Sequence, residues 1–274
     1  MPELPEVETV VRTLETLIIG KKIEDIDILY KSIVVDDEET FKKALIGQTF
    51  KAIKRRGKYI IFELGNEVFI SHLRMEGKYF VVDRDMPINK HIHVIFRLND
   101  HLDLRYQDTR KFGRMELWTK DDDGYKHFKK LGPEPFSDDF NYQYIKDYLK
   151  NKHKPIKTIL LDQSFVAGIG NIYADEILFK MRVHPSTEAS KITKKNIEDL
   201  ITFTRETLAL AIKAGGTTIR SYTSSLGVTG LFQLSLDVHT KEGEACPICG
   251  TTIVKTVVGQ RGTYYCPKCQ KVKL

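Results

Sequence analysis

Apolar residues near the start of the chain recur at every third or fourth position. They lie at Val7, Val10, Val11, Leu14, Leu17 and Ile18. This period predicts an amphipathic helix with Pro5 in its first turn and Gly20 at its end. The first eight residues, Met-Pro-Glu-Leu-Pro-Glu-Val-Glu, therefore lie at the positive, amino-terminal end of a helix.

The pattern changes to short or alternating apolar runs between about Lys22 and Trp118, with glycine, asparagine and aspartate between the runs. The clearest runs cover residues 58–64, 67–73, 91–98 and 101–106. Such runs are typical of an antiparallel sandwich or barrel. Gly132-Pro-Glu-Pro135 then marks a boundary, because two prolines and a glycine continue neither a strand nor a helix.

Helical periodicity follows this boundary and ends at Gly215-Gly216. The predicted helices cover residues 141–151, 155–163, 171–181 and 193–214. Residues 217–230 are polar and long for a plain connection, which favours a lid or recognition loop, with a disordered linker as the alternative. A chain of 274 residues with this pattern predicts an α+β protein of two domains and a small third element.

The four cysteines form two closely spaced pairs, Cys246-Pro-Ile-Cys249 and Cys266-Pro-Lys-Cys269, with sixteen residues between them. This spacing brings four thiolates around one Zn²⁺, with a hairpin between the pairs. Two disulfides are the alternative, but they need an oxidising compartment, and no charged-then-apolar leader precedes residue 2. Four protein ligands leave no open position, so we expect one structural zinc ion.

Charge is unevenly distributed along the chain. The net charge is +6, yet residues 1–50 hold eleven acidic and six basic side chains. The positive remainder favours an acidic partner such as nucleic acid, although solvated surface charge explains it equally well. No apolar run approaches the roughly 18 residues that a membrane span needs, so we expect no membrane association and a cytoplasmic protein.

The start of the chain holds candidate catalytic groups. If Met1 is removed, Pro2 presents a secondary amine, which attacks carbon and forms an iminium. The amino end of a helix disfavours an ammonium and keeps Glu3 and Glu6 ionised, so we expect the pKa of the amine to lie below its usual range. Proline and glutamate are also ordinary first-turn residues, and a purely structural role is the alternative.

Several turns hold candidate binding residues. Five cations surround Gly57 and suit phosphate, namely Lys51, Lys54, Arg55, Arg56 and Lys58. A wedge that fills the gap left by an extruded nucleotide needs apolar side chains and a donor, which Met75, Arg110 and Phe112 supply. Buried packing is the ordinary alternative for such residues. Glycines at 168 and 170 precede a predicted helix whose first amides suit an anion, although tight helix packing explains them too.

Three stretches carry a resemblance to a known family. The run Pro-Glu-Leu-Pro-Glu-Val-Glu-Thr after Met1 resembles the start of the formamidopyrimidine-DNA glycosylases, bacterial enzymes that excise oxidised purines. Residues 162–176, Asp-Gln-Ser-Phe-Val-Ala-Gly-Ile-Gly-Asn-Ile-Tyr-Ala-Asp-Glu, are similar to their helix-two-turns-helix element, and the four cysteines to their zinc hairpin. The matches span residues 2 to 270, so the resemblance covers essentially the whole chain.

The resemblance implies a domain organisation for the chain. We expect an N-terminal β-sandwich catalytic domain with an N-terminal helix over residues 1–131 and a linker at 132–136. A helix-two-turns-helix DNA-binding domain is expected over 137–237, with a lesion-capping loop at 217–230. A zinc-ribbon β-hairpin is expected over 238–274.

The resemblance also implies roles for single residues. Pro2 matches the nucleophile, Glu3 is expected to transfer protons on the sugar, Glu6 to support the amine, and Lys58 to contact the backbone of the damaged strand. The DNA-binding positions match His72, Met75, Arg110, Phe112, Lys157, Asn171 and Arg261. Arg110 addresses the cytosine left behind, while Lys157, Asn171 and Arg261 bind phosphate. In the capping loop, Thr217, Arg220, Ser221 and Tyr222 are expected near the extruded base, although the match is loosest at 224–230.

The implied activity is that of a bifunctional base excision repair enzyme. It removes 8-oxoguanine and formamidopyrimidines from damaged duplex DNA and then cuts the abasic strand by β,δ-elimination; nothing in the sequence suggests more than a monomer. One alternative is an endonuclease VIII-type glycosylase acting on oxidised pyrimidines, against which the long loop and the Arg110/Phe112 pair argue. The other is a non-catalytic DNA-binding zinc-ribbon protein, which would need neither Pro2 nor Glu3.

Overall fold

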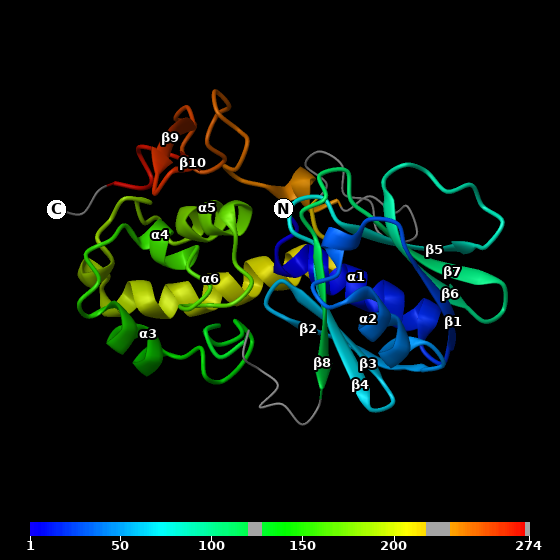
Figure 1. The fold of residues 1–274 in the computed structure, drawn as a ribbon. Coiled ribbons are helices and arrows are strands. Elements are labelled where there is room, and N and C mark those ends of the chain that lie inside the picture. The colour runs from blue at the N-terminus through cyan, green and yellow to red at the C-terminus, as the bar shows by residue number, and fades with distance from the viewer. Residues whose placement is uncertain (120–127, 218–230, 272–274) are drawn as a thin grey trace. The chain divides into compact units, whose positions relative to one another are not determined.

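The computed structural model describes residues 1–119, 128–217 and 231–271 (Figure 1). Internal contacts divide the chain into two compact units. The first unit is Met1–Lys129 with Ala214–Leu231, and the second is Lys130–Lys213 with Phe232–Leu274. The segment after the longest helix thus groups with the first unit, whereas the predicted boundaries placed it in the second domain. Those finer domain boundaries stay predictions.

The first unit is a sandwich of two four-stranded antiparallel sheets. One sheet has the order β1 (Ile23–Ile28), β6 (Ile92–Leu98), β7 (Leu102–Gln107), β5 (Lys78–Asp83). The other has the order β2 (Phe50–Arg56), β3 (Tyr59–Leu64), β4 (Glu67–His72), β8 (Arg114–Thr119). Two helices, α1 (Leu4–Ile18) and α2 (Glu38–Leu45), and the short η1 (Lys31–Ile33) complete the unit. The predicted antiparallel sandwich with an N-terminal helix is confirmed.

One apolar core joins α1 to both sheets. The helix contributes the side chains that the sequence places on one face, among them the fully buried Val7, Val10 and Leu14. In β3, Phe62 is fully buried and stacks on Phe69 of β4 with ring centroids 4.4 Å apart. Each such buried side chain stabilises the fold by about 1.5–3 kcal/mol. This packing holds the start of the chain against the sandwich.

The amino end of α1 is closed by its own side chains. Glu3 is the N-cap and forms a capping box with Glu6, whose Oε2 accepts a hydrogen bond of 2.8 Å from the Glu3 backbone N–H. The box satisfies backbone donors that a helix start otherwise leaves unpaired. Past the helix, Gly20 has φ of 82°, a conformation that glycine adopts without strain. The predicted start and stop of the first helix are confirmed.

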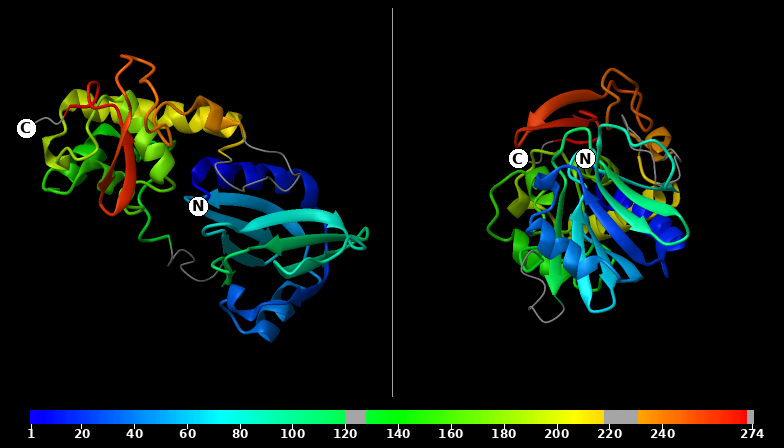
Figure 2. Two further views of the ribbon diagram at one scale, coloured as in Figure 1. Left: turned by 90° about the horizontal axis from the view of Figure 1, so that it is seen from above. Right: turned by 45° about the vertical axis from the view of Figure 1, so that its right-hand side comes forward.

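The second unit is mainly helical. It contains α3 (Tyr142–Leu149), α4 (Ile156–Leu160), α5 (Asn171–Lys180), α6 (Lys194–Lys213), and the short η2 (Ala189–Lys191) and η3 (Phe232–Ser235). The antiparallel hairpin of β9 (Val254–Val258) and β10 (Arg261–Tyr265) lies beside α5 (Figure 2). All four predicted helices and the predicted hairpin are confirmed within a few residues. No helix among the described residues is long and apolar enough to cross a membrane.

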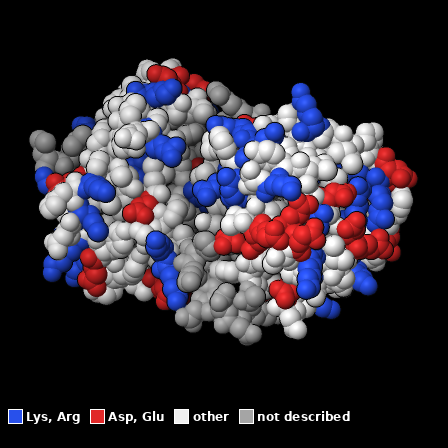
Figure 3. All heavy atoms as spheres, in the orientation of Figure 1, with Lys and Arg blue, Asp and Glu red and all other residues white. Residues whose placement is uncertain are grey.

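The acidic excess of the first fifty residues lies at the surface of the first unit. Figure 3 shows acidic side chains gathered over the region of α2, whose sequence and N-cap supply Asp37, Glu38 and Glu39. In contrast, Glu3 and Glu6 are 3% and 2% exposed. The acidic side chains at α2 are thus solvated, whereas Glu3 and Glu6 at the start of the chain are buried.

Candidate functional site

The start of the chain and the segment after α6 meet at Glu6. Besides its bond to Glu3, the Glu6 carboxylate accepts hydrogen bonds through Oε1 from the Thr217 N–H at 2.8 Å and from Thr217 Oγ1 at 3.0 Å. Gly216 has φ of 78°, and a Cβ built there would lie 2.9 Å from Glu6 Oε1. A side chain at residue 216 would therefore collide with this contact, which explains the glycine.

These contacts bring four predicted site residues together. Pro2, Glu3 and Glu6 are buried at the positive end of α1, and Thr217 binds to one of them. The arrangement provides a secondary amine, once Met1 is removed, beside carboxylates that can move or hold a proton. Arg220, Ser221 and Tyr222, predicted for the same loop, lie outside the described residues.

The basic turn at Gly57 is less open than its sequence suggests. Arg55 pairs with Glu8 of α1 at 2.9 Å, and Lys54 pairs with Glu63 at 2.9 Å. Burial raises the pKa of the Glu8 carboxyl, but hydrogen bonds from Arg55 and Arg12 outweigh it and hold that pKa below its usual value. Arg55 thus holds α1 against the sheet, whereas Lys54 stays 60% exposed in its surface ion pair.

Lys58 lies in the turn between β2 and β3, close to His72 at the end of β4. Lys58 is 6% exposed, and it directly precedes Tyr59, whose register partner across the β3–β4 pair is His72. Burial, with the nearby charges of Arg74 and Lys58, lowers the pKa of His72 to about 3, so the imidazole is neutral at physiological pH. Its Nδ1 accepts a hydrogen bond of 2.9 Å from the Arg74 N–H, which leaves the proton on Nε2 as a donor.

The three residues predicted as a wedge lie in two adjacent turns. Met75 is 39% exposed and Phe112 is 48% exposed, so neither side chain is part of the buried core. The Arg110 guanidinium lies 4.8 Å from the centroid of the Phe112 ring. Thr109 Oγ1 donates a hydrogen bond to the Glu76 carboxylate and thereby joins the Met75 turn (residues 73–77) to the Arg110 turn (residues 108–113). Two exposed apolar side chains and a cation thus share one surface.

The tip of the β9–β10 hairpin gathers three predicted phosphate-binding residues. Asn171, the first residue of α5, donates from Nδ2 to the Gly262 carbonyl at 2.9 Å. Lys157 of α4 donates to the same carbonyl at 3.1 Å and to Thr263 Oγ1 at 2.7 Å. Arg261 is exposed beside them.

Lys157 differs from Arg261 in its burial. Its side chain is fully buried and forms an ion pair of 2.7 Å with Asp175 of α5. The other carboxylate oxygen of Asp175 bonds His239 Nδ1 at 2.7 Å. The Lys157 ammonium therefore contacts oxygens of Gly262, Thr263 and Asp175 and holds the hairpin tip on α4 and α5.

Sequence reasoning missed the carboxylates of α5 and the glutamine before it. Glu176 accepts hydrogen bonds from the backbone N–H groups of Asp237, Val238 and His239. Gln163 bonds the Gly168 N–H and the Ile169 carbonyl, at 2.9 and 2.8 Å. Both residues lie in the run that carries the family resemblance. The available signal in the sequence was a polar side chain within or directly after a glycine-bearing run.

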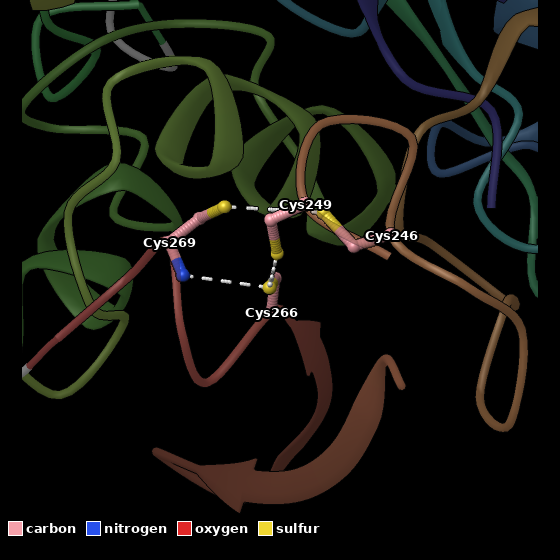
Figure 4. Close-up of side chains that lie close together, drawn as sticks. All are labelled: Cys246, Cys249, Cys266 and Cys269. Atoms are coloured by element: carbon pink, nitrogen blue, oxygen red, sulfur yellow. Dashed lines mark hydrogen bonds between the residues drawn. The ribbon is translucent and has the colours of Figure 1, made fainter. Parts of the chain in front are cut away.

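The four cysteines face one another at the base of the hairpin (Figure 4). Their Sγ atoms lie within 4.8 Å of one another, with 3.5 Å between Cys249 and Cys266 and 3.9 Å between Cys246 and Cys269. Tetrahedral thiolates at the usual zinc–sulfur distance lie about 3.8 Å apart. The donor set therefore fits one Zn²⁺ with no open position, as predicted.

Three family models match the chain along most of its length. They are the Formamidopyrimidine-DNA glycosylase N-terminal domain at residues 1–115, the Formamidopyrimidine-DNA glycosylase H2TH domain at 131–223, and the Zinc finger found in FPG and IleRS at 243–272. The chain belongs to the formamidopyrimidine-DNA glycosylase family. The zinc-finger match agrees with the geometry of the cysteines, which bind one structural Zn²⁺.

Members of the glycosylase family resemble this chain over their whole length. A formamidopyrimidine-DNA glycosylase of Bacillus cereus is 50% identical over 273 residues, which cover 98% of this chain and 99% of the relative. A complex of the Lactococcus lactis Fpg with abasic-site DNA has a TM-score of 0.93 at 46% identity, covering 98% of this chain and 99% of that one. A mutant of that enzyme with Fapy-dG DNA has a TM-score of 0.94 at 45% identity, covering 98% and 100%.

Proposed function

We propose that this glycosylase excises oxidised purines, 8-oxoguanine and formamidopyrimidines, from duplex DNA and then cleaves the abasic strand in base excision repair. The observation that carries the proposal is the buried start of α1, where Pro2 lies beside Glu3 and Glu6. Relatives of the same length have been solved with Fapy-dG and abasic-site DNA, the substrate and the intermediate of this reaction. The enzyme acts in the cytoplasm, on the nucleoid.

Pro2 supplies the nucleophile. Its nitrogen bonds to the anomeric carbon of the extruded nucleoside while the bond from that carbon to the base breaks. The proton that the Pro2 nitrogen loses in this step balances the proton that the departing base gains. Opening of the sugar gives a Schiff base between Pro2 and the sugar carbon. Successive eliminations then expel the 3′ and 5′ phosphates. Glu3 transfers the protons that sugar opening and elimination require.

Glu6 has a supporting role, because its oxygens already accept three hydrogen bonds, one from Glu3 and two from Thr217. It links the nucleophile's helix to the segment that begins the lesion-capping loop. Glu6 therefore holds Thr217 and the backbone of Glu3, the residue after Pro2, on one carboxylate. Arg220, Ser221 and Tyr222 are proposed to line the base within this loop.

Two groups of residues bind the DNA backbone. In the first unit, Lys58 and the neutral His72 contact the damaged strand, with His72 donating from Nε2. In the second unit, Arg261 and Asn171 contact phosphate from the hairpin tip and the start of α5. Lys157 acts indirectly, because its ammonium is buried among protein oxygens and fixes the carbonyl of Gly262 beside Arg261. Met75, Arg110 and Phe112 enter the duplex beside the extruded nucleotide.

Arg261→Ala and Lys157→Met should separate the direct contact from the indirect one. Arg261→Ala should weaken binding to damaged and undamaged duplexes alike and reduce the salt slope by about 1, because one phosphate contact is lost. The melting temperature of the Arg261→Ala variant should not change. Lys157→Met leaves a buried carboxylate without its cation, which costs about 3–5 kcal/mol, so stability and affinity should fall together.

Thermal melting and binding over a series of salt concentrations measure both effects. Lys195→Ala, which removes an exposed lysine paired with Asp199 on α6, is the matched control and should change neither. An affinity loss for Lys157→Met with an unchanged melting temperature would contradict the indirect role and favour direct phosphate contact.

Borohydride trapping tests the proposed function as a whole. Reduction in the presence of an 8-oxoguanine:cytosine duplex should join the DNA covalently to the N-terminal peptide, since borohydride reduces the iminium. Trapping that is equal or stronger on a thymine glycol duplex would assign the enzyme to the oxidised-pyrimidine branch. If no covalent species is trapped on either duplex, the remaining interpretation is a non-catalytic DNA-binding protein.

A further inference from the structure

The Met75 turn and the Arg110 turn rest on a shared pair of buried polar groups. Asp108, the first residue of the Arg110 turn, is fully buried, and Tyr106 at the end of β7 is fully buried beside it. The Tyr106 hydroxyl donates to Asp108 Oδ2 at 3.4 Å. Neither residue has a role in the chemistry proposed above, and neither touches solvent. The Asp108 carboxylate bonds the Tyr106 hydroxyl and backbone N–H groups of the Arg110 turn.

The Asp108 carboxylate shapes the whole Arg110 turn. Its Oδ1 accepts from the Arg110 N–H at 2.9 Å, and its Oδ2 accepts from the Phe112 and Gly113 N–H groups at 2.9 and 2.8 Å. Between them Lys111 has φ of 58°, a left-handed conformation that lysine rarely adopts. A carboxylate that accepts three backbone donors holds such a turn in one shape. The backbone amides of both Arg110 and Phe112 are thus set by one buried side chain.

The Tyr106 hydroxyl lies close to the backbone of both turns. A Cβ built on Gly113 would lie 1.6 Å from this oxygen, and one built on Gly77 would lie 2.4 Å from it. Both glycines therefore allow the backbones of the two turns to close around a single hydroxyl. Burial and the Asp108 charge raise the pKa of Tyr106, which keeps its proton in place for the bond to Asp108. Glu76 and Thr109 join the turns a second time at the surface.

We propose that Asp108 and Tyr106 are positioning residues for nucleotide extrusion, which lock the Met75 turn and the Arg110 turn together so that Met75, Arg110 and Phe112 enter the duplex as one rigid unit. The inference rests on the proposed function, because it assigns a task to the wedge of that enzyme. Long side chains that enter stacked bases lose less freedom when their backbone is already fixed. The expected effect is on base extrusion and on reading of the opposite base, with no effect on the Schiff-base chemistry.

Asp108→Asn tests the positioning role directly. It keeps the shape of the side chain but replaces one accepting oxygen with an NH2 group, which cannot accept hydrogen bonds from the backbone N–H groups of the turn. Single-turnover excision of 8-oxoguanine opposite cytosine should slow about tenfold, the change expected when one charged hydrogen bond is lost. The preference for cytosine over adenine opposite the lesion should fall with it. Borohydride trapping on a duplex with a ready-made abasic site, which needs no base removal, should stay within about twofold of the wild-type protein. Tyr106→Phe should show the same pattern more weakly, about threefold, because its bond is longer.

Asp103→Asn is the matched control. Asp103 is an equally buried carboxylate, on β7, but it pairs with the guanidinium groups of Arg84, Arg97 and Arg105, whereas Asp108 holds backbone N–H groups of the Arg110 turn. Asp103→Asn should lower the melting temperature and leave the opposite-base preference unchanged. If Asp103→Asn reduces that preference as much as Asp108→Asn, the effect is general destabilisation and the inference is wrong.

Other results also decide the matter. If Asp108→Asn does not fold, Tyr106→Phe carries the test alone, and normal excision with normal opposite-base preference in that variant overturns the inference. If Arg110→Ala loses the preference for cytosine opposite the lesion while Asp108→Asn and Tyr106→Phe keep it, Arg110 reads the opposite base as proposed. The positioning role of Asp108 and Tyr106 is then wrong. Wild-type protein that neither traps nor excises overturns the proposed function itself, and this is seen before any variant is made.

Discussion

Pro2→Gly is expected to reduce borohydride trapping and strand cleavage by about 10²-fold while DNA binding stays nearly unchanged. A glycine amine is primary and lacks the ring of proline, so it forms the iminium less readily, yet it removes none of the residues that contact phosphate. Glu3→Gln should bind equally well and lose about 10²–10⁴-fold in base removal, because proton transfer is lost while the size of the side chain is kept. Trapped yield and single-turnover rates, measured beside a binding isotherm, separate chemistry from affinity.

Protein that retains Met1 is the natural negative control for the proline amine. It keeps every side chain of the site but offers no secondary amine, so it should bind DNA and give no trapped species. Peptide mapping of the wild-type adduct should place the DNA on the N-terminal peptide. If the DNA is instead attached to Lys58 or Lys157, the protein is still a lyase but Pro2 is not its nucleophile.

Removal of the zinc is expected to abolish DNA binding. The hairpin unit has a small apolar core, whose buried members are Phe179, Val238, Cys246, Ile253 and Cys266. A module with so little apolar burial depends on its metal to fold. When this module unfolds, Arg261 is no longer fixed in position at the hairpin tip. The hydrogen bond from the Lys157 ammonium to the Gly262 carbonyl is also lost. Chelation or Cys249→Ser should therefore remove several phosphate contacts at once.

The same treatment should leave the melting of the β-sandwich little changed, because its core is formed by α1 and the two sheets. Elemental analysis of the purified protein should find one zinc ion per chain. Ile248→Ser, which changes a half-exposed residue between two ligands without removing a thiolate, is the matched control and should bind DNA normally. Protein free of zinc that still binds damaged duplex with full affinity would disprove the role given to the metal.

Periodic and local patterns in the sequence determined the elements of this protein. The apolar stripe from Val7 to Ile18 predicted α1, because a helix repeats its buried face every 3.6 residues whatever it packs against. The paired cysteines predicted the zinc site for a similar reason, since ligand spacing within each pair is a local constraint. The family resemblance then indicated which residues of these elements to examine. All of these signals lie within short stretches of chain.

Only the tertiary structure decided which polar groups meet. Glu6 bonds Thr217 across more than two hundred residues, and Lys157 is buried because Asp175 and the hairpin tip close around it. Asp108 is an ordinary turn aspartate in the sequence, yet it is fully buried beneath the wedge. A charged side chain is buried only where its partners satisfy it, and those partners come from elements far apart in the chain. Residue spacing specifies each element by itself, whereas the packing of those elements decides which charges reach solvent and which act within the protein.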